Sequence, residues 1–209
     1  MKYELQNLIQ GKGGTGKGDL IQQIAANLRT GKGAGTGNEK EEYTKQQEEK
    51  SLIAYIDEKA LWYTGIISEY TQIGEGAEQK VYYDARKGTV IKTNDSIFYK
   101  YWEDYFHSLI VHNYLFSDTA YKFLGFRLVD ENLFAVVEQS HIIKTEDVDL
   151  NDVQDFLETN GFRNTRRNDY YNDDLGIILE DLHDENVISS SNMLFFVDTV
   201  FYLTDKFYE

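Results

Sequence analysis

The sequence lacks two residue types completely, because its 209 residues include no cysteine and no proline. Without cysteine, the chain can form neither a disulfide framework nor a thiolate metal site. Without proline, its turns must depend on Gly, Asn, Asp and Ser. An apolar run of membrane-spanning length and a charged-then-apolar signal at the N-terminus are also absent. These absences predict a cytoplasmic protein with no membrane partner.

Positive charge is scarce, because 21 Lys and Arg residues face 36 Asp and Glu residues, for a net charge of −15. A charge of this sign does not attract nucleic-acid phosphates or anionic lipids, so a nucleic-acid partner is not expected. Arg163–Arg167 is the one local basic cluster. The 16 Tyr and 12 Phe residues can fill a dense core, and the length fits one to two domains.

Residues 1–66 are predicted to form a helical N-terminal extension. Asp19 can cap a helix whose apolar residues follow at helical spacing. Gly31–Asn38 has the composition of a flexible linker. The next stretch, Glu39–Ala60, is predicted to form one long helix with a solvated first half. Its buried stripe is expected to consist of Leu52, Ile53, Ile56 and Ala60.

A glycine-rich motif lies within this extension. Gly11–Lys17 matches the glycine and lysine positions of a Walker A loop, which binds phosphate through backbone amides. Position 18 is glycine, whereas a Walker A loop has Ser or Thr there for Mg²⁺. No buried strand precedes the motif and no parallel-sheet pattern follows it. We therefore favour a flexible connector and keep a P-loop NTPase as a distant alternative.

From Thr71 the pattern changes to that of β-strands. Ile73–Val81 reads as a glycine-containing hairpin, and glycines allow a backbone to approach a phosphate closely. Lys92 ends a short apolar strand. Asp95 is expected to cap a helix that runs to about Phe116. The residues of this helix expected to point inward are Trp102, Phe106, Leu109 and Ile110, with Glu103 at the border of the buried face.

Two further strands, Lys122–Asp130 and Leu133–Glu138, are expected to complete a five-stranded antiparallel sheet. Asp149 then opens a short helix whose apolar side is expected to hold Leu150, Val153, Phe156 and Leu157. A polar stretch, Arg163–Asp174, leads into the last segment.

The segment Gly176–Asp198 carries the residues with the clearest chemistry. Two short apolar runs end at or near an aspartate, and between them Asp181 and Asn186 lie five residues apart on a tight connection. Phosphoryl transfer uses such a set, because one Asp orients the attacking hydroxyl while an Asn and a second Asp hold Mg²⁺. Asp198 supplies the second aspartate.

In this order, the motifs resemble those of protein kinases, and the Asp-Leu-His opening is closer to aminoglycoside-phosphotransferase-like enzymes. The strings GEGAEQKVY, WEDYFHSL and LEDLHDENV are similar to the compact kinase-like domain of polyvalent proteins, carried by bacterial phages and conjugative elements. The resemblance implies an α+β, minimal two-lobed kinase-like fold over residues 67–209. The small lobe is expected over about 67–140 and a reduced large lobe over about 141–209.

The resemblance also implies ATP and Mg²⁺ as cofactors and a role for each matching residue. Asp181 would be the catalytic aspartate, Asn186 and Asp198 would bind the metal, and His183 stands where many kinases have a phosphate-steadying lysine. The expected nucleotide-binding residues are Gly74, Gly76, Val81, Lys92, Glu103, Glu138 and Ser140. The last two of these would form the hinge that offers backbone groups to adenine.

Three departures from the kinase pattern keep a second interpretation open. Leu179 and Glu180 replace the usual His-Arg, Thr199 and Val200 replace the usual Phe-Gly, and Gln79 replaces the third loop glycine. One interpretation is an active phosphotransferase acting on a hydroxyl of a protein or small molecule. The other is a pseudokinase that binds nucleotide or a protein partner without turnover.

Overall fold

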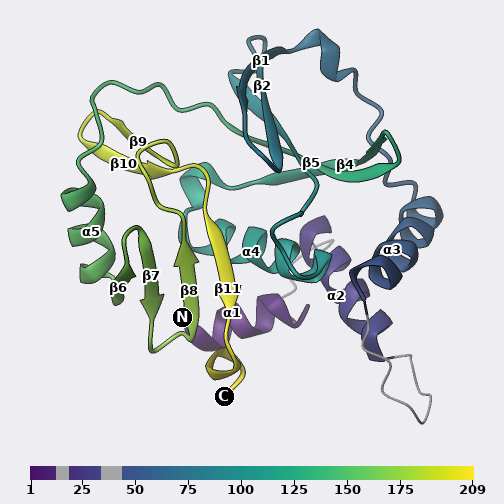
Figure 1. Ribbon diagram of the computed structural model, residues 1–209, viewed down its shortest axis with the longest axis horizontal. Helices are drawn as coiled ribbons and strands as arrows, with labels where there is room; N and C mark the ends of the chain where they lie inside the picture. Colours follow the sequence, from purple (N-terminus) through teal and green to yellow (C-terminus); the bar gives the residue numbers. More distant parts are fainter. Residues whose placement is uncertain (13–18, 34–43) are drawn as a thin grey trace. The chain divides into compact units, whose positions relative to one another are not determined.

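The computed structural model describes residues 1–12, 19–33 and 44–209, and these form two compact units (Figure 1). Unit 1 comprises Met1–Gly14, His107–Ala120 and Ile142–Glu209, and unit 2 comprises Thr15–Phe106 and Tyr121–His141. The Gly11–Lys17 motif lies mostly outside the described residues. No described helix is long and apolar enough to cross a membrane.

Unit 2 is built on a five-stranded antiparallel sheet with the strand order β1-β2-β3-β5-β4, as the sequence predicted. Asp130 and Glu131 form the turn between β4 and β5, where both residues have positive φ values of 50° and 68°. Such a two-residue turn matches the twist of a hairpin. The strands are β1 (Thr71–Glu75), β2 (Gln79–Asp84), β3 (Thr89–Asn94), β4 (Lys122–Val129) and β5 (Asn132–Ser140).

Helices α2 (Leu20–Gly33) and α3 (Lys45–Lys59) lie side by side in unit 2 (Figure 1). The predicted cap is confirmed, because the carboxylate of Asp19 accepts a hydrogen bond from the amide of Ile21 at 3.1 Å. The predicted start of the linker at Gly31 is wrong, because α2 continues to Gly33; residues 34–38 lie outside the described residues. Ala60 is exposed in a left-handed cap and does not join the buried stripe.

Helix α3 begins later than the predicted Glu39. Thr44 caps it in a capping box with Gln47, which satisfies amides that the first turn leaves unpaired. Residues 39–43 lie outside the described residues. Leu52 and Ile56 are buried as expected.

Helix α4 (Trp102–Leu115) contributes its first five residues to unit 2 and the rest to unit 1. The prediction that Asp95 caps this helix is wrong, because its carboxylate accepts from the amide of Ile97 in a turn that precedes α4. The first amides of α4 instead donate to the buried carboxylate of Glu48 on α3. A long-range contact has replaced the local cap.

The aromatic core of unit 2 joins the start of α4 to strand β4. Trp102 and Phe106 are fully buried and meet Phe126 edge-to-face, with ring centroids 6.0 Å and 5.9 Å away. Phe123 contacts Phe106 in the same way at 5.6 Å. Edge-to-face rings combine apolar burial with a favourable quadrupole geometry, so these contacts hold α4 against the sheet.

Unit 1 contains a four-stranded sheet of order β11-β8-β7-β6 and a separate β9–β10 hairpin. The polar stretch Arg163–Asp174, for which no secondary structure was predicted from the sequence, forms much of the β6–β7 hairpin. The remaining elements are α1 (Lys2–Ile9), α5 (Leu150–Thr159), β6 (Phe162–Arg166), β7 (Asp169–Asn172), β8 (Ile177–Glu180), β9 (Val187–Ser190), β10 (Met193–Phe196) and β11 (Val200–Leu203).

Helix α1 packs within unit 1 against the C-terminal end of the chain. Leu5 and Ile9 are buried, and the side chain of Gln6 donates to the carbonyl of Phe207 at 2.6 Å. On α5, Val153 and Leu157 are buried as predicted, whereas Leu150 and Phe156 are exposed. The predicted boundary between an extension over 1–66 and a kinase-like domain over 67–209 stays a prediction.

Gly176 at the start of β8 should not tolerate a side chain. Its φ is +71°, and an added Cβ would overlap the backbone of Lys206 and Phe207. Gly88 has a similar φ of +66° but open space around its Cβ position. We expect Gly176→Ala to lower the free energy of unfolding by about 3 kcal/mol or more, and Gly88→Ala by only about 1 kcal/mol. Urea unfolding of both variants measures the difference, and equal losses would contradict the overlap.

Candidate active site

The site residues of unit 1 are brought together by two antiparallel pairings. Strand β8 pairs with β11 so that Glu180 lies opposite Val200. Strand β9 pairs with β10 so that Val187 lies opposite Phe196. The residue after β8 is Asp181, and the short turn between β10 and β11 contains Asp198. The two pairings therefore bring the connection after β8 and the turn before β11 to the same end of β8 and β9.

Asn186 links the two aspartates through hydrogen bonds. Its side-chain Nδ2 donates to the backbone carbonyl of Asp181 at 2.7 Å and contacts the Asp181 carboxylate at 3.3 Å. Its backbone carbonyl accepts from the amides of Val197 at 3.0 Å and Asp198 at 3.3 Å. The structure thus assembles the three residues that the sequence selected for base and metal roles.

The backbone at Asp181 adopts a conformation that few side chains favour. Its φ is +63°, in the left-handed region that Asp and Asn tolerate better than most residues. Its amide donates to the carboxylate of Asp169 at 3.2 Å, and its carbonyl accepts from the amide of His183 at 3.0 Å. These contacts hold the loop in one arrangement.

His183 lies within this hydrogen-bonded loop. Its Nδ1 accepts a hydrogen bond from the amide of Glu185 at 3.3 Å. Nε2 lies 3.6 Å from a carboxylate oxygen of Asp181 and 3.1 Å from Nδ2 of Asn186. His183 is therefore placed beside the candidate catalytic aspartate.

Sequence reasoning missed a buried polar network that holds the residue after Asp198. The hydroxyl of Thr199 lies 2.7 Å from Nδ1 of His112, and Nε2 of His112 lies 2.9 Å from the carbonyl of Thr119. Ser108 donates to the carbonyl of Thr199 at 3.5 Å and accepts from the amide of Phe201 at 3.0 Å. Ser108 and His112 are four residues apart on α4, so they lie on the same side of the helix, and this spacing was the available signal.

In unit 2 the strand register aligns three of the predicted nucleotide-binding residues. Gly74 lies opposite Val81 across β1 and β2, and Val81 lies opposite Lys92 across β2 and β3. Directly opposed residues share one face of a sheet. The three residues therefore form one row across adjacent strands. Gly76 follows β1 in the turn, where its amide donates to the carbonyl of Gln79 at 2.7 Å.

Lys92 and Glu103 are both buried, with exposed fractions of 4% and 7%. The ammonium of Lys92 lies 5.3 Å from the ring centre of Tyr121, within the range of a cation–π interaction. The amide of Glu103 donates to Glu48 at 3.3 Å, so α3 holds the backbone at this position. Glu48 was not predicted, although it lies four and eight residues before Leu52 and Ile56 and shares their helix face.

The two predicted hinge residues lie at the end of β5. Glu138 is opposite Ile91 in β3, so its side chain lies on the face of the sheet away from Lys92, which pairs with the neighbouring Val137. Its carboxylate forms ion pairs with Lys87 at 2.8 Å and Lys122 at 3.6 Å. The pairing with β4 ends opposite Glu138, so among the described strands Ser140 pairs only with β3.

The donor atoms at Asn186 and Asp198 suit a hard divalent cation. Mg²⁺ binds through carboxylate, amide and water oxygens. Because Nδ2 of Asn186 is used by the carbonyl of Asp181, the amide oxygen of Asn186 is left for a different ligand. The side chains present are therefore of the kind that Mg²⁺ binds, and no thiolate or imidazole is required.

Unit 2 holds an antiparallel five-stranded sheet with a Gly–Val–Lys row, and unit 1 holds an Asp–Asn–Asp cluster in the connections beside paired strands. Each of the two features is of a kind found in kinase-like proteins. The family model described as Serine/Threonine/Tyrosine Kinase found in polyvalent proteins matches residues 45–205, and the chain belongs to this family. The matched region begins at the first residue of α3. No curated protein matches the chain.

Glu180, directly before Asp181, gives the site a measurable pH dependence. Burial raises the pKa of the Glu180 carboxyl, and the nearby Asp169 and Asp181 raise it further. Ionising Glu180 therefore costs stability at pH values above its raised pKa, and this cost disappears below the ordinary carboxyl range of about 4. We expect Glu180→Gln to stabilise the protein near neutral pH, by up to about 1 kcal/mol after solvent screening.

Thermal unfolding from about pH 7.5 down to about pH 3.5 measures this effect, and the gain should fade as the pH decreases. Glu185→Gln is the matched control, because this exposed residue lies in the same loop. A gain in Glu180→Gln that persists unchanged in acid would show that charge is not its cause.

Proposed function

We propose that the chain is an ATP- and Mg²⁺-dependent phosphotransferase that transfers the γ-phosphoryl group to a hydroxyl of a protein or small molecule. The observation that carries the proposal is the hydrogen-bonded cluster of Asp181, Asn186 and Asp198. It combines a base with two oxygen ligands for a metal. This is the set of groups that phosphoryl transfer requires.

In the proposed reaction, Asp181 orients the acceptor hydroxyl and takes up its proton. A bond forms between the hydroxyl oxygen and the γ-phosphorus while the bond from that phosphorus to the bridging oxygen breaks, and ADP leaves with that electron pair. Asn186 and Asp198 would hold Mg²⁺, which supplies positive charge to the phosphate oxygens when bound. His183 would keep the Asp181 carboxylate in position.

The nucleotide would be held by the Gly74–Val81–Lys92 row of unit 2. Neither Gly74 nor Gly76 has a positive φ, and an added Cβ would make only ordinary contacts of 3.5 Å and 3.8 Å. The fold alone therefore does not require glycine at either position. Close approach of a triphosphate supplies a reason for both glycines. Lys92 would pair with the α- and β-phosphates and Glu103 with Lys92, while the backbone at Glu138 and Ser140 would face the adenine.

One observation favours the alternative of a pseudokinase. Glu180 places a carboxylate beside Asp181, where kinases have an arginine. The carboxylate of Asp169, which accepts from the amide of Asp181, adds negative charge near the same loop. Like charges gathered at this point oppose the approach of a phosphate. Binding of nucleotide without turnover is what this alternative predicts.

Activity is tested with ATP radiolabelled on its γ-phosphate and a bacterial extract as the source of acceptors. Asp181→Asn keeps a residue that tolerates the left-handed backbone and removes the base. We expect it to reduce labelling by roughly 100-fold or more, the range of a lost general base. Asp184→Asn, an exposed residue of the same loop, is the control and should label as the wild type does. Equal labelling by Asp181→Asn would rule out transfer that depends on Asp181.

Nucleotide binding separates the kinase-like site from the Walker-type motif. Calorimetry with ATP and MgCl₂ should show binding weakened by roughly tenfold or more in Lys92→Met, which removes a buried charged donor at similar volume. Lys50→Met, an exposed lysine of α3, is the control. Lys17→Ala should bind normally. Loss of binding in Lys17→Ala with retention in Lys92→Met would instead establish a P-loop site. Tight Mg²⁺-dependent binding by a variant in which both Asn186 and Asp198 are replaced by alanine would overturn their metal roles.

A further inference from the structure

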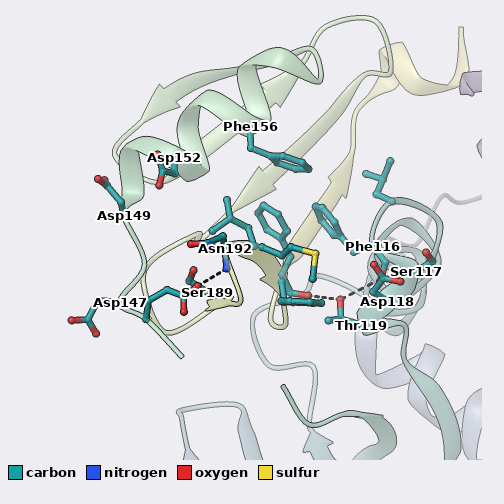
Figure 2. A pocket seen from close by; sticks show the side chains of 16 residues that line it. Phe116, Ser117, Asp118, Thr119, Asp147, Asp149, Asp152, Phe156, Ser189 and Asn192 are labelled. Atoms are coloured by element: carbon teal, nitrogen blue, oxygen red, sulfur yellow. Dashed lines mark hydrogen bonds between the residues drawn. The ribbon is translucent and has the colours of Figure 1, made fainter. Parts of the chain in front are cut away.

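Unit 1 contains a cavity of about 650 Å³ that the proposed reaction does not use. Figure 2 shows its lining residues, which come from α5, from the β9–β10 hairpin, from the turn after α4 and from the chain before α5. The volume is in the range of sites that bind ligands or side chains of a partner. The cavity borders the β9–β10 hairpin, and Asn186 and Asp198 lie in the chain just before β9 and just after β10.

The floor of this cavity is aromatic. Phe116 and Phe196 stack with ring centroids 4.2 Å apart, and Phe156 lies 5.4 Å from Phe196. In Figure 2 the side chain of Phe156 extends from α5 into the cavity. Phe156 is 42% exposed and Met193 is 57% exposed. Covering large apolar side chains that are this exposed contributes favourable free energy to the binding of a partner.

Five carboxylates and no lysine or arginine line the same cavity. Three of them have partners within the chain, because Glu146 accepts from the amide of Asn192, Asp147 pairs with Lys144, and Asp149 caps α5. The carboxylates of Asp118 and Asp152 have no hydrogen bond or ion pair within the described part of the chain. Figure 2 shows these two on opposite sides, with Phe156 and Phe116 between them.

From this arrangement we propose that the cavity is a docking groove for a peptide segment in which arginines flank an apolar residue. Asp118 and Asp152 would each pair with a guanidinium, and the phenylalanine floor would receive the apolar side chain. Arginine suits both parts of the groove, because its planar group binds carboxylates and also stacks on aromatic rings. A simple polyamine offers the charge without the apolar group that the floor would cover.

The test measures binding and does not depend on phosphoryl transfer. Fluorescence anisotropy follows a fluorescein-labelled peptide, Gly-Arg-Leu-Arg-Phe-Arg-Gly, at low salt. One comparison peptide has citrulline in place of each arginine, and another has serine in place of the leucine and phenylalanine. We expect the first peptide to bind and each comparison peptide to bind roughly tenfold more weakly.

The net charge of −15 attracts any basic peptide, so the protein variants are matched in charge. The pocket variant combines Asp118→Asn and Asp152→Asn. The control combines Asp155→Asn and Asp174→Asn, two exposed carboxylates of unit 1 that do not line the cavity. We expect the pocket variant to weaken peptide binding roughly tenfold and the control by less than about twofold. Phe156→Ser should also weaken binding, with circular dichroism confirming the fold.

Equal weakening in the pocket variant and the control would overturn the groove and leave only long-range attraction. Equal binding of the serine-substituted peptide would show that the phenylalanine side chains of the cavity do not contribute to binding. Displacement of the labelled peptide by spermine as effectively as by unlabelled peptide would assign the cavity to small polycations. Self-association in sedimentation that Phe156→Ser abolishes would assign it to a second copy of the chain. Each of these results contradicts a peptide groove.

Discussion

The candidate active site depends on the antiparallel pairing of β8 with β11. Glu180 lies opposite Val200, so the loop that begins at Asp181 and the turn that contains Asp198 leave the sheet together. A slip of one residue would turn every side chain of the shifted strand to the other face and would move the turn at Asp198 relative to the loop at Asp181. Gly176 supports this register from the start of β8, because only glycine fits against the backbone of Lys206 and Phe207.

The turn before β11 is held by hydrogen bonds where the kinase pattern has Phe-Gly. Thr199 is buried and contacts both Ser108 and His112 of α4. Buried polar groups stabilise a structure only when their partners are in place, so this network favours one position of the turn. The same principle applies in unit 2, where the buried carboxylate of Glu48 accepts from the first amides of α4. Polar contacts with segments distant in sequence thus determine where α4 begins, and later residues of α4 hold the turn at Thr199 in place.

The sequence predicted much of the fold where the relevant signal was local. Hairpin turns and alternating strands follow from neighbouring residues, and the five-stranded sheet formed as expected. The inward residues predicted for α4 are buried, but so is nearly every other residue from Trp102 to His112, which only the packing of distant segments decides. The caps of α2 and α5 were also correct, because Asp19 and Asp149 accept from amides two residues away. The start of α4 was wrong, because Glu48 replaces the local cap from 54 positions earlier in the chain.

By itself the sequence determined which residues are candidates for the chemistry, since the order of Asp181, Asn186 and Asp198 and their spacing are properties of the chain. Only the tertiary structure decided how they meet, because strand register and the bonds of Asn186 involve segments that are not adjacent in sequence. It also decided that Arg163–Asp174 pairs as a hairpin and that Phe156 faces a cavity. The packing of the whole unit decides which strand a polar stretch pairs with. It also decides whether an apolar side chain is buried or exposed.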